Sequence, residues 1–505
     1  MMPTALLSVY DKTGLEHLAR GLTTMGWRLV SSGGTSQALT DWGIEHDSVE
    51  SVTGSAEVLG GRVKTLHPRI HGGILADRSN PAHLRDLEGQ GIDPIDLVVC
   101  NLYPFRADPS IEMIDVGGPT MVRAAAKNHA HVGVVVDPAE YGSTLDELRR
   151  EGELSVSTRR RLARAAFAHT AAYDAAIVGW LDETDPAAEV LPPTLHLALE
   201  RAQSLRYGEN PHQRGARYRS IGETSWWDAV IQHSGLELSY LNLFDAEAAW
   251  RLVHDLGDQP AAAIIKHANP CGAAVAADLP TAYRLAFECD ERSAFGGIVA
   301  VNGVVDDATC NAIVAAAQAD VIIAPAYAPG TLDRLRAKRK NTRLLEVPSP
   351  PGSRGLDYRQ ISGGFLVQEP HAFVAARADW RVVTKETPTD AQWVDVELAW
   401  RLVGHVKSNA IVLVKGGQAV GIGAGQQNRV ESGQIAASKA AGRARGGACA
   451  SDAFYPFPDG VEAAATAGAA VVIQPGGSLR DDEVIAAADR LGLAMVLTGE
   501  RHFLH

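Results

Sequence analysis

The feature that most constrains the fold is an internal repeat in the second half of the chain. Residues 245–253 read DAEAAWRLV and residues 395–403 read DVELAWRLV, identical at seven of nine positions and separated by 150 residues. An apolar run typical of a strand follows each copy, AAAIIKH at 261–267 and NAIVLVK at 409–415. Two Ala-rich helices can agree by chance, but the shared polar residues and the matching next element favour a duplication. We therefore expect two similarly built α/β subdomains that meet near residue 385, with a ligand site between them.

The first 190 residues show a different pattern, the alternation of strands and helices that is typical of an α/β domain. Short apolar runs occur at 5–9, 28–30, 96–100 and 131–136, and a stretch with helical spacing begins at Thr13. The continuous apolar runs suit strands buried on both faces of a parallel sheet. A Pro-containing, charged stretch at 182–193 indicates a linker. The chain is thus expected to form domains at 1–190, 200–385 and 386–505.

Composition excludes several classes of protein. The net charge of −13 argues against a polynucleotide partner, which draws on an excess of Lys and Arg. The longest apolar candidate, 463–473, is far shorter than the roughly 20 residues that cross a bilayer, and the N-terminus lacks the basic region of a signal peptide. Five scattered cysteines without a CxxC pair favour a reducing cytoplasm over disulfides or a thiolate zinc site.

Two turns in the first domain have the composition of an anion site. Ser31-Ser32-Gly33-Gly34-Thr35 follows a strand and opens a helix, so glycines and helix N–H groups can approach a phosphate. A second polar turn follows the first strand, at the sheet edge where open α/β sheets bind ligands, and contains Ser8, Lys12 and Thr13. The first turn alone also fits a simple helix N-cap; together the turns favour phosphate. Neither has the Walker spacing of a nucleoside triphosphate site.

Further polar groups of the first domain suit proton transfer and oxyanion stabilisation. Residues 62–68 combine Arg62, Lys64, Thr65 and a histidine in a loop bounded by Gly and Pro. For most pairs of basic residues a solvated loop is the simpler interpretation. Strand ends and the following helix supply the remaining candidates, which are Asn101, Tyr103, Asp115, Arg123 and Lys127. Arg123 and Lys127 are one helical turn apart on one face.

In the second half the most informative motif is Lys266-His267, where a buried strand emerges into a turn. A lone histidine at a strand end is more often structural, but the adjacent lysine favours a neutral imidazole that can act as a base. Arg206-Tyr207 lies in a polar segment directly after the linker. The GxGxG run at 421–425 lacks the third glycine of a dinucleotide site, so that reading is weak.

Many ordered motifs together resemble one family. SVYDKTGL, SSGGTS, GRVKTLHPRIHGGIL, CNLYPF, IDVGGPTMVRAAAKNHAHVGVVV, LRYGENPHQ, KHANPCG, SAFGGIVAVN, VKSNAIVLVKGGQAVGIGAGQQNRVES, SDAFYPFPDGVE and IQPGGSLRDDEVI span nearly the whole chain. The chain resembles the bifunctional purine-biosynthesis enzymes that join AICAR formyltransferase to IMP cyclohydrolase. The resemblance implies a methylglyoxal-synthase-like parallel-sheet domain at 1–190 and two cytidine-deaminase-like α/β subdomains after it.

The resemblance also implies roles for individual residues. For formyl transfer it implies a catalytic group of Lys266, His267 and Asn409. For ring closure it implies a catalytic group of Lys64, Tyr103, Asp115 and Lys127. Substrate contacts are implied for Ser8, Lys12, Thr13, Ser32, Gly34, Thr35, Arg62, Thr65 and Asn101 in the first domain, and for Arg206, Tyr207, Phe295, Asp320, Arg429, Phe454, Arg501 and Phe503 in the second half.

By the same resemblance, the substrates are AICAR, formyl-AICAR and 10-formyltetrahydrofolate, the last as formyl donor. No metal is expected in the chemistry, and a requirement for a monovalent cation is left open. A cytoplasmic homodimer with formyltransferase sites at the subunit interface is expected, without nucleic-acid or membrane partners. Three alternatives stay open: a zinc deaminase, although Cys271 lacks the PCxxC signature, a methylglyoxal-synthase-like phosphate lyase, and a nucleotide sensor without catalysis. Leu504 departs from a tail position that is often basic in relatives.

Overall fold

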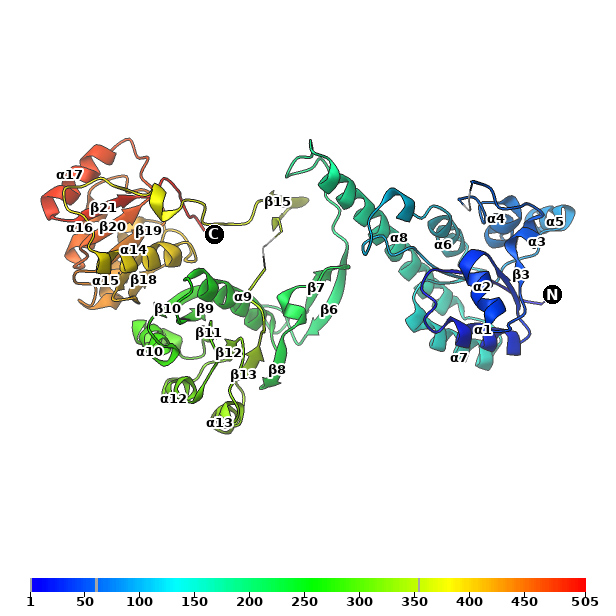
Figure 1. Cartoon of the computed structure of the whole chain (residues 1–505), viewed down its shortest axis with the longest axis horizontal. Coiled ribbons are helices and arrows are strands. Elements are labelled where there is room, and N and C mark those ends of the chain that lie inside the picture. Colours follow the sequence, from blue (N-terminus) through cyan, green and yellow to red (C-terminus); the bar gives the residue numbers. More distant parts are fainter. Residues whose placement is uncertain (1, 60–61, 353–354) are drawn as a thin grey trace. The chain divides into compact units, whose positions relative to one another are not determined.

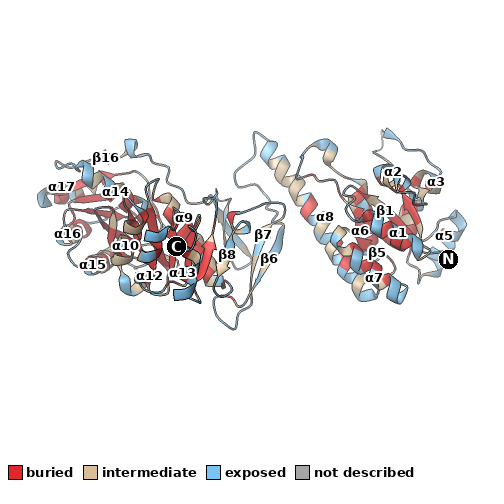
Figure 2. Ribbon diagram, turned by 60° about the horizontal axis from the view of Figure 1, so that its bottom comes forward, coloured by how far each residue is buried: buried red, intermediate tan, exposed pale blue. Residues whose placement is uncertain are grey.

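The computed structural model describes residues 2–59, 62–352 and 355–505 and divides into two compact units (Figure 1). One unit comprises Met1–Glu200 with Ser220–Gly222, and the other comprises Arg201–Arg219 with Glu223–His505. Gly61, the first residue of one motif quoted above, lies outside the described residues. Each unit has its own buried core on the strands and on the helix faces that cover them (Figure 2).

The N-terminal unit is built on a five-stranded parallel sheet in the order β3-β2-β1-β4-β5. Its elements are β1 (Thr4–Val9), α1 (Leu15–Thr24), β2 (Arg28–Ser31), α2 (Gly33–Asp41), β3 (Asp47–Ser48), α3 (Val49–Thr53), α4 (Pro68–Leu75), α5 (Pro81–Gln90), β4 (Leu97–Asn101), α6 (Gly117–Lys127), β5 (Gly133–Val135), α7 (Tyr141–Glu151) and α8 (Val156–Thr184). The parallel α/β fold expected for this region is confirmed.

Successive residues of β1 pack on opposite faces of this sheet, as the pleat of a strand requires. Leu6 packs in a core with α4, α6 and α8, whereas Ala5 and Leu7 pack in a second core with α1 and α7. The strand register pairs Leu7 with Ser31 and Val9 with Asn101. The carboxyl ends of β1, β2 and β4 therefore meet at one edge, where the strand order reverses and α/β sheets bind ligands.

Two predicted boundaries differ from the observed ones. The first helix begins at Leu15 rather than Thr13, because Gly14 precedes it with a φ of 71° in the left-handed region. The expected linker at 182–193 overlaps α8, which continues to Thr184 before an irregular stretch. The second half of α8 is mostly exposed or half-buried (Figure 2), since its buried residues end at Tyr173.

The C-terminal unit is built on one mixed sheet of twelve strands, in the order β16-β21-β20-β19-β17-β18-β10-β9-β11-β12-β13-β8. Its first half contains β6 (Leu199–Leu205), β7 (Gly215–Ser220), β8 (Ile231–Ser234), α9 (Tyr240–Asp255), β9 (Ala261–Lys266), β10 (Asn269–Val275), α10 (Leu279–Cys289), α11 (Glu291–Ala294), β11 (Ile298–Val301), α12 (Asp307–Ala315), β12 (Val321–Ala324), α13 (Thr331–Lys338) and β13 (Arg343–Glu346).

The rest of the unit contains β14 (Asp357–Ile361), β15 (Gly364–Gln368), β16 (Arg381–Val382), α14 (Asp390–Val403), β17 (Ile411–Lys415), β18 (Gln418–Gly423), α15 (Arg429–Ala440), β19 (Ala448–Ser451), α16 (Asp459–Thr466), β20 (Val471–Gln474), α17 (Asp481–Leu491) and β21 (Ala494–Leu497). Each half thus runs through a helix, an antiparallel hairpin, a second helix and parallel strands. The order α9-β9-β10-α10-β11 recurs as α14-β17-β18-α15-β19.

The repeated helices α9 and α14 cover the same face of the twelve-stranded sheet and share one core. Trp250 and Trp400, the tryptophans of the two repeat copies, are both buried in it. The other face is covered by α10, α12 and α13 in the first half and by α15, α16 and α17 in the second. The repeat found in the sequence therefore corresponds to two α/β halves with a continuous sheet between them.

The apolar runs compared above, 261–267 and 409–415, must be shifted by one residue against each other to bring equivalent positions together. Register pairs Lys266 with Asn269 in the first hairpin and Lys415 with Gln418 in the second. The two-residue turns are therefore His267-Ala268 and Gly416-Gly417, and Lys266 corresponds to Lys415. Among the described residues, no helix is both long and apolar enough to span a membrane.

Candidate active sites

The SGGT turn of the N-terminal unit has the geometry of an anion site. Ser32 precedes α2 in an extended conformation and, within the described part of the chain, makes no side-chain capping bond to the helix. The first N–H groups of α2 thus remain available to a ligand, which is the arrangement that binds phosphate. Gly33 has a φ of 55°, a left-handed conformation that favours glycine. This geometry favours the anion site over the simple N-cap.

Two lysine ammonium groups lie beside this turn. The Nζ of Lys64 is 3.3 Å from the point that a Cβ on Gly33 would occupy, and the Nζ of Lys12 is 3.8 Å from the corresponding point on Gly34. Lys64 also forms an ion pair of 2.9 Å with Glu57, a residue that the sequence analysis did not single out. Two cations and a helix N-terminus thus surround a space suited to one phosphate.

Other predicted substrate contacts of this unit instead hold the sheet edge together. The hydroxyl of Thr35 donates to the carbonyl of Val9 at 2.9 Å and accepts from its N–H at 3.0 Å. Asn101 accepts from the N–H groups of Tyr10 and Asp11 at 2.6 and 2.9 Å. These two side chains therefore position the turn after β1. Their hydrogen bonds could not be read from the sequence, because they join distant segments.

The remaining predicted contacts of this unit lie nearer the surface, with one exception. Ser8 is half-buried near the end of β1, and Thr13 is exposed in the turn that follows it. Arg62 is exposed and pairs with Glu112. Thr65 is buried, and its hydroxyl lies 3.2 Å from the point that a Cβ on Gly117 would occupy. Thr65 therefore packs against the start of α6.

Asp115 is the half-buried carboxylate of this edge. Burial raises its pKa above the ordinary value of 3.8, against hydrogen bonds from the backbone of Gly118 and Tyr103 that lower it. The N–H of Asp115 donates to the hydroxyl of Tyr173 at 2.8 Å, and that hydroxyl donates to the carbonyl of Met113 at 2.7 Å. Tyr173 of α8 thus fixes the segment that carries Asp115. A carboxyl with a raised pKa is suited to exchanging a proton.

Two aromatic rings lie together at the same edge. The Tyr103 side chain is exposed and meets Tyr10 edge to face, with 5.7 Å between the ring centroids. Tyr10 follows β1 directly and was not recognised in the sequence, where it reads as an ordinary residue of the first turn. Its contact with Tyr103 comes from the pairing of β1 with β4.

Lys127 lies away from Asp115 within one chain. It ends α6, whose first residue Gly117 is about 15 Å away at 1.5 Å of rise per residue. It lines an open cavity of about 550 Å³ together with His71, Arg123 and His129. The structure therefore groups Lys64, Tyr103 and Asp115 at the sheet edge and places Lys127 elsewhere.

In the C-terminal unit, Lys266 and Asp320 converge on one glycine turn. The Nζ of Lys266 donates to the carbonyl of Phe295 at 2.5 Å. It lies 3.2 Å from the point that a Cβ on Gly296 would occupy, and an Asp320 carboxylate oxygen lies 3.8 Å from the same point. His267 follows Lys266 in the turn, with a left-handed φ of 55°. The Phe295 side chain itself is exposed.

Arg206 and Tyr207 lie close to this group. The guanidinium of Arg206 stacks over the Tyr207 ring at 4.9 Å and donates to its hydroxyl at 3.1 Å. Both residues act electrostatically on Arg343, as does Asp320. Burial lowers the pKa of Arg343, whereas the charge of Asp320 raises it. Arg343 was missed in the sequence, because nothing in its local pattern separates a buried arginine from an exposed one.

A second cluster forms around Asp452 in the other half of the unit. Its fully buried carboxylate pairs with Arg429 and accepts from the hydroxyl of Ser408 at 2.6 Å. Arg429 also donates to the side-chain oxygen of Asn409 at 2.8 Å, and the amide nitrogen of Asn409 donates to the carbonyl of Gln426 at 2.9 Å. Burial raises the pKa of Asp452, opposed by the charge of Arg429. Asp452 lies in the SDAFYPFPDGVE motif, but its sequence context does not show that the side chain is buried.

The C-terminal tail is tied to this cluster by backbone bonds. The N–H of His502 donates to the carbonyl of Asp452 at 2.9 Å, and Ser408 donates to the carbonyl of Leu504 at 2.9 Å. The departure at Leu504 therefore does not alter the backbone contacts that hold the tail. The guanidinium of Arg501 stacks over the Phe503 ring at 4.5 Å.

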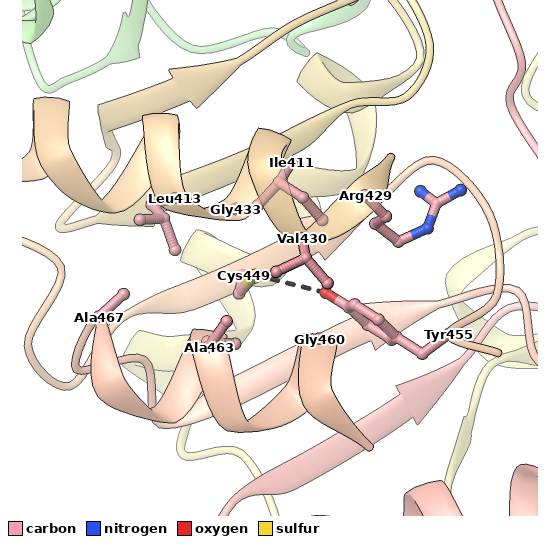
Figure 3. A pocket seen from close by; sticks show the side chains of 11 residues that line it. Ile411, Leu413, Arg429, Val430, Gly433, Cys449, Tyr455, Gly460, Ala463 and Ala467 are labelled. Carbon is pink, nitrogen blue, oxygen red and sulfur yellow. Dashed lines mark hydrogen bonds between the residues drawn. The ribbon is translucent and has the colours of Figure 1, made fainter. Parts of the chain in front are cut away.

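The aromatic segment after β19 does not enclose a substrate-sized cavity. Phe454 is partly exposed, whereas Tyr455 is buried and its hydroxyl lies 3.7 Å from the sulfur of Cys449 (Figure 3). The cavity beside Tyr455 measures only about 10 Å³, about the space of one water molecule. Arg429 lies at its rim, and its guanidinium points away from it (Figure 3).

Strand register brings the two clusters to the same end of the sheet. The hairpins pair through Ala274 and Gln418 in antiparallel fashion, and Ile411 pairs with Gly423. The turn at 267–268 therefore lies beside the segments that begin β17 and follow β18. The side-chain oxygen of Asn269 accepts from the N–H of Lys407 at 3.0 Å, which joins the two segments directly.

The duplicated half keeps the scaffold of the first cluster but not its titratable groups. Lys415 donates at 3.1 Å to the carbonyl of Gly446, which corresponds to Gly296, and Lys266 donates to the carbonyl of the preceding residue, Phe295. At the positions of His267 and Asp320, however, the second half has Gly416 and Ala470. Ala470 is identified by its bond to Gly447, which matches the bond of Asp320 to Gly297. A common scaffold therefore carries a histidine and a carboxylate in one copy alone.

The zinc and dinucleotide readings find no support in the geometry. The described residues contain no group of three or more His, Cys, Asp or Glu side chains that could hold a metal ion. Cys271 is a buried free thiol whose pKa is raised to about 12 by burial. The GxGxG run belongs to an antiparallel hairpin, because β18 pairs with β17 and β10. The βαβ unit of a dinucleotide site is therefore not formed there.

Comparisons with known proteins agree with the two units. A family model described as AICARFT/IMPCHase bienzyme matches residues 125–439, and one described as MGS-like domain matches residues 14–129. Proteins named Bifunctional purine biosynthesis protein PurH are similar over the whole chain. The protein from Sorangium cellulosum is 52% identical and that from Cyanothece sp. 49% identical, each with 100% of both chains covered. The chain therefore belongs to the AICARFT/IMPCHase bienzyme family, the bifunctional enzymes of purine biosynthesis.

Proposed function

We propose that the two activities of this family are divided between the two units of the chain. The family joins AICAR formyltransferase to IMP cyclohydrolase, which catalyse the last two steps of purine biosynthesis. Residues 1–190 carry the cyclohydrolase, and residues 200–385 and 386–505 form the formyltransferase as two deaminase-like subdomains. The observation that carries this division is the presence of a separate anion-binding edge and a separate histidine-bearing turn, one in each unit.

In the cyclohydrolase, the 5′-phosphate of formyl-AICAR binds at the SGGT turn. Ser32, Gly34 and the ammonium group of Lys12 hold it, supported by the uncapped start of α2. The carboxamide nitrogen then attacks the formyl carbon, so negative charge develops on the formyl oxygen before water is lost. Lys64 stabilises that charge, while Asp115 exchanges protons with the reacting atoms.

The remaining proposed contacts of the cyclohydrolase fall into two groups. Tyr103 belongs to the catalytic group with Lys64 and Asp115, whereas Arg62 and Thr65 orient the nucleobase of the substrate. Ser8 and Thr13 contact the phosphate, whereas Thr35 and Asn101 act through the backbone that they hold. Lys127 reaches this site from a second copy of the chain, because it ends α6, about 15 Å along the helix from Gly117, which starts the helix two residues after Asp115. A homodimer could supply it.

In the formyltransferase, His267 accepts the proton of the AICAR amine as that amine attacks the formyl carbon. The C–N bond to the folate breaks, and tetrahydrofolate leaves with the proton at its nitrogen. Lys266 lies beside His267 and stabilises the oxyanion of the tetrahedral intermediate. The loss of the histidine and carboxylate from the second copy, on a preserved scaffold, supports this placement of the chemistry.

Substrate contacts in this unit are proposed for both clusters. Arg206, Tyr207 and Asp320 bind the nucleotide next to Lys266. Asn409 and Arg429, which belong to the second cluster, contact the formyl group. The nucleotide and the folate are contacted by Arg501 and by the exposed rings of Phe295, Phe454 and Phe503. The site is completed at the interface of a cytoplasmic homodimer. Five buried free cysteines support a reducing compartment.

The experiment supplies AICAR and 10-formyltetrahydrofolate to the purified full chain. Release of tetrahydrofolate and formation of IMP are followed separately by absorbance, and the metal content is measured in the same preparation. Both products should appear without bound zinc. Stoichiometric zinc, together with ammonia release from a nucleoside, would favour a deaminase instead. Failure to form either product in folded protein would refute the proposed function.

A further inference from the structure

The two hairpins of the C-terminal unit end in turns with the same backbone conformation but different residues. The first turn, His267-Ala268, has φ angles of 55° and 57°, and the second, Gly416-Gly417, has φ angles of 61° and 73°. Each connects strands whose flanking residues pair directly. Two-residue hairpins of this kind are type I′ turns, which favour Asn and Gly because both central residues are left-handed.

The first turn is therefore strained and the second is not. A side chain with a Cβ is disfavoured in the left-handed region, because the Cβ crowds the backbone there. His267 and Ala268 both have one, so the turn needs a contact from outside the hairpin to remain in this conformation. The strain falls on the residue that carries the proposed base.

That contact comes from Asp245 of the repeated helix α9. Its Oδ1 accepts the N–H of Ala268 at 2.8 Å. The carboxyl is half-buried, and burial raises its pKa, whereas the backbone of Ala268 and the charges of His267 and Lys266 lower it. The half-buried acceptor thus lies directly beside the turn that carries His267.

We propose that Asp245 is a positioning residue of the formyltransferase, which holds the His267-Ala268 turn in its left-handed conformation and so aims the imidazole at the AICAR amine. This inference rests on the proposed role of His267. In this role Asp245 acts through the backbone of Ala268 and not on the reacting atoms.

In the second half of the unit, the equivalent hydrogen bond supports a turn whose backbone is not strained. Asp395 of α14 corresponds to Asp245, and its Oδ1 accepts the N–H of Gly417 at 2.9 Å. The carboxylate therefore belongs to the shared scaffold of both copies. In the second copy it meets two glycines, which adopt the left-handed region at no steric cost. Asp395 thus provides a matched internal control for Asp245.

The test compares Asp245→Ala, Asp245→Asn and Asp395→Asn in the full chain, with formyl transfer measured as kcat and KM. In Asp245→Ala the turn relaxes and the imidazole moves, so kcat should fall about 10²-fold while KM for AICAR changes little. Asp245→Asn retains an oxygen that accepts the same N–H, so it should remain within about tenfold of wild type. Asp395→Asn should leave kcat unchanged.

A second substitution separates positioning from folding. Ala268→Gly removes one strained Cβ, so Asp245→Ala/Ala268→Gly should recover at least about tenfold of the lost kcat. Unchanged kcat in Asp245→Ala overturns the inference. A loss of kcat in Asp245→Ala that Ala268→Gly does not restore also overturns the inference. An equal loss of kcat in Asp395→Asn overturns it as well. His267→Ala is measured alongside: if it retains formyl transfer, the proposed function itself is wrong, whereas an inactive His267→Ala with a fully active Asp245→Ala refutes the positioning role alone.

Discussion

The buried ion pair between Arg429 and Asp452 should carry much of the stability at the start of α15. The Asp452 side chain is 0% exposed and that of Arg429 is 10% exposed, so water screens neither charge. In Asp452→Asn the guanidinium would keep the Asn409 oxygen and the Ser451 hydroxyl as neutral partners. Removing one partner of a buried pair costs about 3–5 kcal/mol, because the other charge is left uncompensated. For a unit of about 300 residues, with about 2.1 cal/mol/K of unfolding entropy per residue, that corresponds to a Tm lower by about 5–8 °C.

Differential scanning calorimetry of the full chain measures this change, with the two activities as a second readout. Asp452→Asn should lower the Tm of the C-terminal transition and reduce formyl transfer, while the cyclisation of supplied formyl-AICAR is retained. Asp307→Asn is the matched control, since its pair with Arg334 is 79% and 43% exposed and exposed pairs contribute little. Equal Tm values for Asp452→Asn and wild type, or an equal shift in Asp307→Asn, would refute the reasoning.

Three further experiments test the N-terminal site. Burial raises the pKa of Asp115, so the acid limb of the pH profile of cyclisation should lie above pH 3.8. Asp115→Asn should abolish that limb and lower kcat about 10²-fold. An acid limb that persists in this variant would contradict a proton-transfer role for Asp115. Ser32→Ala should raise KM for formyl-AICAR at unchanged Tm, because the Ser32 side chain makes no capping bond to the helix. Thr35→Ala should instead lower Tm, because its hydroxyl bonds the backbone of Val9 at a buried position and losing such a bond costs about 1–3 kcal/mol. Mixing Lys64→Ala with Lys127→Ala chains should recover cyclisation if a second copy supplies Lys127; no recovery after confirmed subunit exchange would exclude that arrangement.

Local sequence patterns were sufficient for part of the fold and for choosing the candidate site residues. Apolar runs located β1, β2, β4 and β5 within two residues, and the repeat located α9 and α14. Glycine-bounded turns pointed to the SGGT segment, and a strand end pointed to Lys266-His267. These features depend on short stretches of chain, where periodicity and turn chemistry determine the conformation.

Tertiary relations could not be predicted in the same way. The single twelve-stranded sheet and the correspondence of Lys266 with Lys415 depend on strand register, which no local pattern reveals. In the sequence, Asp452 and Arg343 cannot be distinguished from exposed charged residues, and their burial appears only in the structure. The helical spacing of Arg123 and Lys127 placed both on one face of α6 but did not show which end of the helix meets the site. Packing, rather than propensity, decides each of these.

The division of the two reactions between the two units is tested most directly by crossing two variants with two substrates. His267→Ala and Lys64→Ala are each given AICAR with 10-formyltetrahydrofolate, and then formyl-AICAR alone. His267→Ala should lose tetrahydrofolate release yet still cyclise formyl-AICAR, because the SGGT edge and Asp115 belong to the other unit. Lys64→Ala should release tetrahydrofolate but fail to cyclise. If each substitution abolishes both reactions in folded protein, the two-site account is contradicted.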